Sequence, residues 1–274
     1  MVIALMILPA LALLLNSDRD IASTSRKWRV KRASGMSRVM GVQQLTANVP
    51  SAMGLSSGSC VLFDAMIVMP GCDYGFECGK LFGRFPGRLG HLHNGDNAKT
   101  PRPSIYWALD NGIFGAWQSG TEWSEEPLYS FLERFGTFGP EWVAVPDAVA
   151  DRELTLERWD THAEVIASFG VPLAFVVQDG MTPADVPDEA EVVFVGGSTS
   201  FKWRTLRTWC DNFERVHVGR VNTERHLWQC HDAGAESCDG TGWFRGGETR
   251  LSGLVRYLET STAGERPQLE MQLK

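Results

Sequence analysis

The sequence predicts an α/β protein built as a single (β/α)8 barrel of the TIM type. From about residue 39 onward, short apolar runs rich in β-branched residues alternate with amphipathic helical runs, which is typical of a parallel sheet with helical crossovers. The 274 residues, 43% of them apolar, are enough to fill one core of this size. Eight strands are predicted, at residues 39–43, 61–68, 105–109, 142–145, 173–177, 192–195, 215–218 and 235–238.

Helical periodicity fills the intervals between the later strands. Asp151 and Asn222 each precede a predicted helix and are expected to be its N-cap, because their side-chain oxygens can accept from the first free backbone N–H groups. Residues 69–104 are rich in Gly and Pro and show no clear helix, so an irregular loop insertion is expected there. The predicted helices cover residues 126–135, 153–169, 203–213, 223–233 and 249–260.

The expected organisation is an N-terminal extension over residues 1–37, the barrel over 38–262 and a tail over 263–274. Residues 1–15 are apolar but shorter than the roughly 20 residues that span a bilayer, and no basic start marks a signal peptide. Three interpretations remain open: translation starts later, at Met36 or Met40; the segment serves membrane attachment or export; or it forms an ordered helix. No membrane contact is expected of the barrel itself.

Composition narrows the possible functions. The formal net charge of −7 excludes a polycation that coats nucleic acid by bulk electrostatics. Six irregularly spaced cysteines do not form the framework of a disulfide-rich protein and indicate reduced thiols, so a cytoplasmic location is expected. Residues 200–256 are nevertheless more basic than the acidic stretch before them, and they mix cations with aromatic rings. Candidate nucleic-acid contacts are Lys202, Arg204, Arg207 and Arg245, unless these side chains are simply solvated.

Polar residues and glycines follow six of the predicted strands. In a parallel barrel, reacting groups come from the carboxyl ends of the strands, although any one of these residues could be an ordinary turn residue. Three carboxylates would share one bowl, which suits acid–base and nucleophilic chemistry at a glycosidic bond, and their like charges would raise some of the pKa values. The strand-end residues are Asp110, Asp147, Gln178, Asp179, Gly196, Gly197, Gly219, Arg220 and Asp239.

A metal site is the alternative use of several carboxylates. It is disfavoured because no strand carries a compact carboxylate or His pairing. A second set, Cys72, Cys78, His91 and His93, has spacings that match no common zinc module. No cofactor is therefore expected.

The strand-end motifs resemble the phage and bacterial DpdA family (deoxypurine in DNA protein A), which is similar in turn to the tRNA-guanine transglycosylases. These transglycosylases are (β/α)8 barrels that exchange guanine for a 7-deazaguanine. They carry a structural zinc bound downstream of their nucleophile, whereas no Cys or His follows Asp239 here, so that zinc is not expected. The resemblance lies in the runs 108–112, 145–147, 175–183, 194–198, 217–222 and 234–241.

The resemblance implies a role for each matching position. Asp239 would be the nucleophile and Asp110 would handle the proton of the exchanged base. Asp147, Gln178 and Gly197 would read the base edge. The other substrate-binding candidates are Asp179, Gly196, Gly219 and Arg220.

The implied function is the exchange of guanine in double-stranded DNA for 7-cyano-7-deazaguanine, in the host cytoplasm if the protein is encoded by a phage. Two other enzymes fit the same barrel, a tRNA-guanine transglycosylase and a base-excising glycosylase. A hypothesis from another class is a non-catalytic barrel that binds nucleic acid through the basic C-terminal third. The sequence indicates no oligomeric state.

Overall fold

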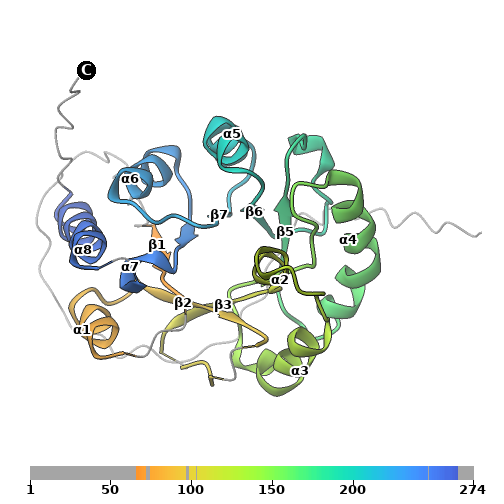
Figure 1. Ribbon diagram of the computed structural model, residues 1–274, viewed down its shortest axis with the longest axis horizontal. Helices are drawn as coiled ribbons and strands as arrows, with labels where there is room; N and C mark the ends of the chain where they lie inside the picture. The colour runs from red at the N-terminus through yellow and green to blue at the C-terminus, as the bar shows by residue number, and fades with distance from the viewer. Residues whose placement is uncertain (1–65, 72–74, 97–98, 103, 246, 265–274) are drawn as a thin grey trace, which may run out of the picture. The chain divides into compact units, whose positions relative to one another are not determined.

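The computed structural model describes residues 66–71, 75–96, 99–102, 104–245 and 247–264, all of which fall within one compact unit of the chain. Eight parallel strands form a nearly closed barrel with helices around it (Figure 1). The predicted (β/α)8 class is therefore confirmed. The strands are β1 (Ile67–Met69), β2 (Gly90–Asn94), β3 (Tyr106–Asp110), β4 (Val143–Ala144), β5 (Leu173–Val177), β6 (Val192–Val195), β7 (Val216–Val218) and β8 (Ser237–Asp239).

Every neighbouring pair of strands in the order β1-β8-β7-β6-β5-β4-β3-β2 is parallel. The seam between β1 and β2 is narrow: Val68 bridges Leu89, and the Val68 N–H donates to the Arg88 carbonyl at 3.0 Å. The helices are α1 (Phe76–Arg84), α2 (Ile113–Ser119), α3 (Glu126–Phe135), α4 (Arg152–Ala167), α5 (Thr199–Asn212), α6 (Glu224–Ala233), α7 (Gly242–Arg245) and α8 (Glu248–Thr262), with 3-10 turns at Gly136–Phe138 and Pro183–Asp185.

The expectation of an irregular insertion over residues 69–104 is wrong, because this stretch contains helix α1 and strand β2. Strand β2 reads Gly-His-Leu-His-Asn, and its polar composition hides an ordinary strand. His91 packs on the Phe82 ring of α1, and His93 packs between the rings of Trp107 and Phe131. The imidazoles thus occupy places that apolar side chains usually fill. The predicted strand 39–43 and the boundary at residues 37 and 38 lie outside the described residues.

One of the two predicted N-caps is confirmed. The Asp151 carboxylate accepts from the Leu154 N–H at 3.0 Å and caps α4. The prediction for Asn222 is wrong, because Thr223 caps α6 instead. The Asn222 side-chain carbonyl accepts from the Gly242 N–H at 2.7 Å, so Asn222 joins the loops that follow β7 and β8.

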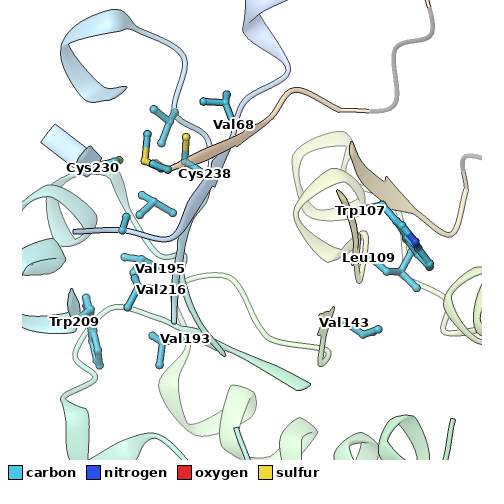
Figure 2. Packing of buried hydrophobic residues seen from close by; sticks show 14 of the residues in the cluster. Val68, Trp107, Leu109, Val143, Val193, Val195, Trp209, Val216, Cys230 and Cys238 are labelled. Atoms are coloured by element: carbon cyan, nitrogen blue, oxygen red, sulfur yellow. The ribbon is translucent and has the colours of Figure 1, made fainter. Parts of the chain in front are cut away.

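Side chains alternate along each strand between two apolar layers. The outer layer packs against the helices; Figure 2 shows strand residues such as Val193 and Val216 with Trp209 of α5 and Cys230 of α6. The inner layer fills the barrel with Met69, Ala108, Trp142, Ala144, Ala174, Val176, Val192 and Phe194. This alternation turns Asp110 and Asp239 inward, because each lies two residues after an inward-facing position. In the described ranges, no helix has the length and apolarity needed to cross a membrane.

Trp142 is the largest side chain of the inner layer, 1% exposed, and its ring contacts those of Phe194 and His217. We expect Trp142→Ala to lower the free energy of unfolding by about 3–5 kcal/mol, because it leaves a cavity that the barrel cannot close. Urea denaturation measures the change. Trp117→Ala is the matched control, since Trp117 is 61% exposed and its loss should change stability by about 0.5 kcal/mol or less. Equal effects of the two substitutions would contradict the packing assignment.

Candidate active site

A cavity of about 600 Å³ opens at the carboxyl ends of the strands. This volume is in the range of small-molecule sites. Segments after all eight strands contribute to its wall, and the three predicted carboxylates, Asp110, Asp147 and Asp239, all line it. Gln178, Gly196, Gly197, Gly219, Arg220 and Arg245 line it as well.

Asp239 is held through one of its two oxygens. Oδ2 accepts from the Arg220 backbone N–H at 3.1 Å and lies 3.2 Å from His217 Nε2. His217 Nδ1 lies 2.8 Å from the Ser237 hydroxyl. An ionised carboxylate can only accept, so Nε2 carries the proton, and in the neutral imidazole Nδ1 accepts from Ser237. Among the described residues, nothing hydrogen-bonds to Oδ1, which leaves that oxygen available to a ligand.

Asp147 is embedded in amide donors. Asn111 Nδ2 donates to its Oδ1 at 2.8 Å, and Gln178 Nε2 donates to its Oδ2 at 2.5 Å. The Ala150 N–H donates to Gln178 Oε1 at 2.9 Å and so fixes which end of that amide faces Asp147. Burial raises the pKa of Asp147 to about 6, although the hydrogen bond from Asn111, the nearby Arg158 charge and the hydrogen bond from Gln178 oppose the rise.

Asp110 has the weakest support of the three carboxylates. The hydrogen bond from the Gly112 N–H to its Oδ1 is long, at 3.4 Å. Burial, together with the negative charges of Asp239 and Asp147, raises the pKa of Asp110 to about 7. A carboxyl group that titrates near neutral pH can both give and take a proton, as general acid–base catalysis requires.

Two non-glycine residues of the described chain have left-handed backbone, and both serve the cavity. Arg220 (φ 60°) directs its N–H at Asp239, and Ala150 (φ 58°) directs its N–H at Gln178. Such conformations are unfavourable for residues with a Cβ and are concentrated at functional sites.

Glycines bring the backbone close to the cavity. A Cβ on Gly219 would lie 2.5 Å from Phe194 Cε2, and one on Gly196 would lie 2.9 Å from Val176 Cγ1 and 3.0 Å from Gln178 Nε2. Side chains are therefore excluded at both positions, and the backbone itself forms this part of the cavity wall.

The remaining predicted binding residues lie in several different places. Asp179 is not in the cavity; it accepts from the Ser198 N–H and hydroxyl, both at 2.6 Å, and orders the loop before α5. Arg220 lines the cavity, with its guanidinium over the Phe114 ring. Arg245 lines the rim and is exposed. Arg204 is exposed on α5.

Two of the predicted nucleic-acid contacts point away from the cavity. Arg207 pairs with Asp211 and donates to the Asp232 carbonyl, near the end of α6 that precedes β8. Lys202 is not at the surface, contrary to expectation: it is buried behind β7, and Nζ donates to the Gly219 carbonyl. Only a surface cation can contact a phosphate group, so this placement argues against the predicted role of Lys202.

The zinc candidates that the structure describes, Cys78, His91 and His93, do not gather into a metal-binding group. His91 and His93 face outward into the aromatic layer, and burial lowers the pKa of His93 to about 4. Cys72 lies outside the described residues, and over the rest of the described chain no three His, Cys, Asp or Glu side chains gather into a metal-binding group. Cys238, beside Asp239, faces the outer layer, where burial raises the pKa of its thiol.

Sequence reasoning missed three residues that organise the site: Asn111, His217 and Ser237. His217 of β7 and Ser237 of β8 are buried polar residues that face the barrel interior. Side chains two positions apart on a strand face the same side of the sheet. A polar residue two positions before a strand-end candidate is therefore expected to face inward as well, and this rule identifies both His217 and Ser237. No known protein-family model matches the chain, and a comparison with curated proteins gives no significant match.

The raised pKa of Asp110 predicts a pH-dependent stability. Its folded-state value of about 7 exceeds the ordinary 3.8, so the stability that it contributes is fully present below pH 3.8 and lost as the pH rises through 7. Asp110→Asn should therefore be more stable than the wild type by about 2–4 kcal/mol at pH 8, with little difference at pH 4. Urea denaturation at several pH values measures this, with the exposed Asp160→Asn as control. A difference that does not vary with pH would contradict the assignment.

Proposed function

We propose that the protein exchanges guanine in DNA for a 7-deazaguanine by double displacement. The observation that carries the proposal is the asymmetric support of the inward carboxylates. Asp239 has one oxygen fixed by His217 and Arg220 and the other available, whereas Asp110 titrates near neutral pH. A fixed nucleophile beside a proton carrier is what displacement at a glycosidic carbon requires. The resemblance of the strand-end motifs to DpdA and the tRNA-guanine transglycosylases supports the same chemistry.

In the first half-reaction, the target guanine leaves the base stack and enters the cavity, at a cost of a few kcal/mol. Asp147 and Gln178 hydrogen-bond its edge beside the Gly196-Gly197 backbone. Oδ1 of Asp239 attacks C1′ of the deoxyribose and forms an ester bond. The C1′–N9 bond breaks and its electron pair stays on guanine. The protonated Asp110 donates its proton to the leaving base, which departs as neutral guanine.

In the second half-reaction, the incoming 7-deazaguanine occupies the place that guanine left. Asp110 takes its N9 proton, N9 attacks C1′, and the ester bond to Asp239 breaks with its electron pair returning to the carboxylate. Asp110 ends the cycle protonated, as it began. The two steps thus balance in atoms and charge with no oxidant, reductant or nucleotide.

The deciding experiment incubates duplex DNA that carries radiolabelled guanine with the protein, with and without 7-cyano-7-deazaguanine, and then analyses the digested nucleosides by mass. We expect label release together with a new deazaguanine nucleoside. Abasic sites without added base would indicate a glycosylase instead, and release from tRNA alone would move the substrate to RNA. Salt-sensitive DNA binding without any release would favour the non-catalytic barrel.

Asp239→Asn should lower the rate of guanine release by more than about 10³-fold, because an amide is a poor nucleophile. The covalent DNA adduct, detected by mass after denaturation, should disappear with it. Asp211→Asn, on the exposed face of α5, is the control and should keep wild-type activity. Full exchange activity in the Asp239 variant would remove the nucleophile from the mechanism.

Asp147→Asn replaces an acceptor with a donor that faces the Asn111 or Gln178 amide, and so disrupts recognition of the guanine edge. We expect kcat/KM to fall by about 10²-fold for guanine. Discrimination against hypoxanthine, which lacks the 2-amino group, should fall as well, since that group has lost its acceptor. Competition between the two bases in one DNA duplex measures the ratio. An unchanged ratio would show that Asp147 does not read the base.

A further inference from the structure

Lys202 is a buried cation behind the cavity. It lies on the inner face of α5, is 2% exposed, and has the apolar neighbours Phe201 and Leu206 on the same helix. Its Nζ donates to the Gly219 carbonyl. In the part of the chain that the structure describes, no carboxylate oxygen lies within the 4.0 Å of an ion pair with Nζ. A buried cation without an adjacent anion is unfavourable, so packing alone does not explain a lysine here.

The carbonyl that Lys202 binds belongs to the peptide group that supports Asp239. Gly219 supplies the C=O of this peptide and Arg220 supplies its N–H, which donates to Asp239 Oδ2 at 3.1 Å. Hydrogen bonds at the two ends of one amide polarise it in the same sense and strengthen each other. The Lys202 charge is thereby conveyed to the carboxylate without direct contact.

The Gly219–Arg220 peptide has a fixed orientation. The Gly219 N–H donates to the Val195 carbonyl at 3.2 Å, and Arg220 holds a left-handed conformation. A Cβ on Gly219 would lie only 2.5 Å from Phe194 Cε2, so no side chain fits at the turn. The peptide can face Asp239 only while its carbonyl points outward, and Lys202 is the group that stabilises that carbonyl.

The side chain of Lys202 remains mostly protonated at neutral pH. Burial and, to a smaller extent, the positive charge of Arg220 lower its pKa to about 8, against the opposing effect of the negative charge of Asp239. The titratable groups around it are Arg220 of the β7–α6 loop, His226 and Cys230 of α6, and Cys238 and Asp239 of β8.

We propose that Lys202 is a positioning residue for the nucleophile, acting through the Gly219–Arg220 peptide. It holds Oδ2 of Asp239 in place so that Oδ1 faces the reacting sugar carbon. This inference rests on the proposed role of Asp239.

Lys202→Met keeps the length of the side chain and removes its charge. We expect kcat for guanine release to fall about tenfold with KM for DNA unchanged, because the weakened hydrogen bond acts on the reacting group and not on DNA binding. By NMR, the Arg220 amide proton should move upfield and exchange faster with solvent. Leu206→Met places the same side chain one turn along the inner face of α5, and should change neither readout.

The two readouts separate the failure of this proposal from failure of the function. An unshifted Arg220 amide, or wild-type kcat, in Lys202→Met would overturn the role of Lys202 while base exchange stands. A shifted amide in a protein whose wild type exchanges no base would refute the function and leave the coupling of Lys202 to the Arg220 amide supported. If the Met variant does not fold, Lys202→Gln keeps a donor without the charge and should show a smaller change in the same direction; no change would again overturn the proposal.

Discussion

Three carboxylates line one cavity, and the rest of the site is arranged to offset the cost of burying their charges. Like charges in a region of low dielectric cannot all remain ionised unless each receives its own donors. Asp147 has two side-chain amides, and Asp239 has an imidazole N–H and a backbone N–H. Within the described chain, Asp110 receives donors from the backbone alone, the Gly112 N–H at a long 3.4 Å, and burial together with the charges of Asp239 and Asp147 raises its pKa to about 7. The three carboxyl groups thus differ in the kind of donor that each receives: side-chain amides at Asp147, an imidazole and a backbone N–H at Asp239, and backbone N–H groups at Asp110.

The groups that donate to these carboxylates belong to strands and tight turns, which are rigid parts of the fold. His217 and Ser237 lie on strands, and the His217 ring packs against the rings of Trp142 and Phe194. The backbone N–H groups that reach Asp239 and Gln178 come from turns with left-handed residues. Such turns are unfavourable on their own and persist only where their surroundings determine them. The Trp142 ring contacts His217, so the apolar interior of the barrel and the polar site share one boundary. Packing below the cavity therefore sets the geometry within it.

Much of the fold followed from the sequence, because apolar runs such as 173–177 and 192–195 have clear boundaries and correspond residue for residue to β5 and β6. Strand β2 was missed because its outward positions carry His91 and His93, which pack as aromatic rings but read as polar residues. The strand-end carboxylates could be predicted because parallel strands bring their carboxyl ends to one face. Asp179 and Lys202 could not, since the loop bond to Ser198 and the bond to the Gly219 carbonyl depend on side-chain directions that no local pattern specifies.

The electrostatics of the site also bear on how a polyanion could approach it. A chain of net charge −7 with an acidic cavity repels phosphate groups at long range. Near the mouth of the cavity, the exposed Arg245 and the guanidinium of Arg220 provide local positive charge, and protonation of Asp110 removes one negative charge from the interior. The attraction is therefore confined to the rim, where a phosphate would lie, while the acidic interior admits a neutral base. This separation of charge between rim and interior suits the proposed substrate, whose uncharged base would enter the cavity while its charged backbone stays outside.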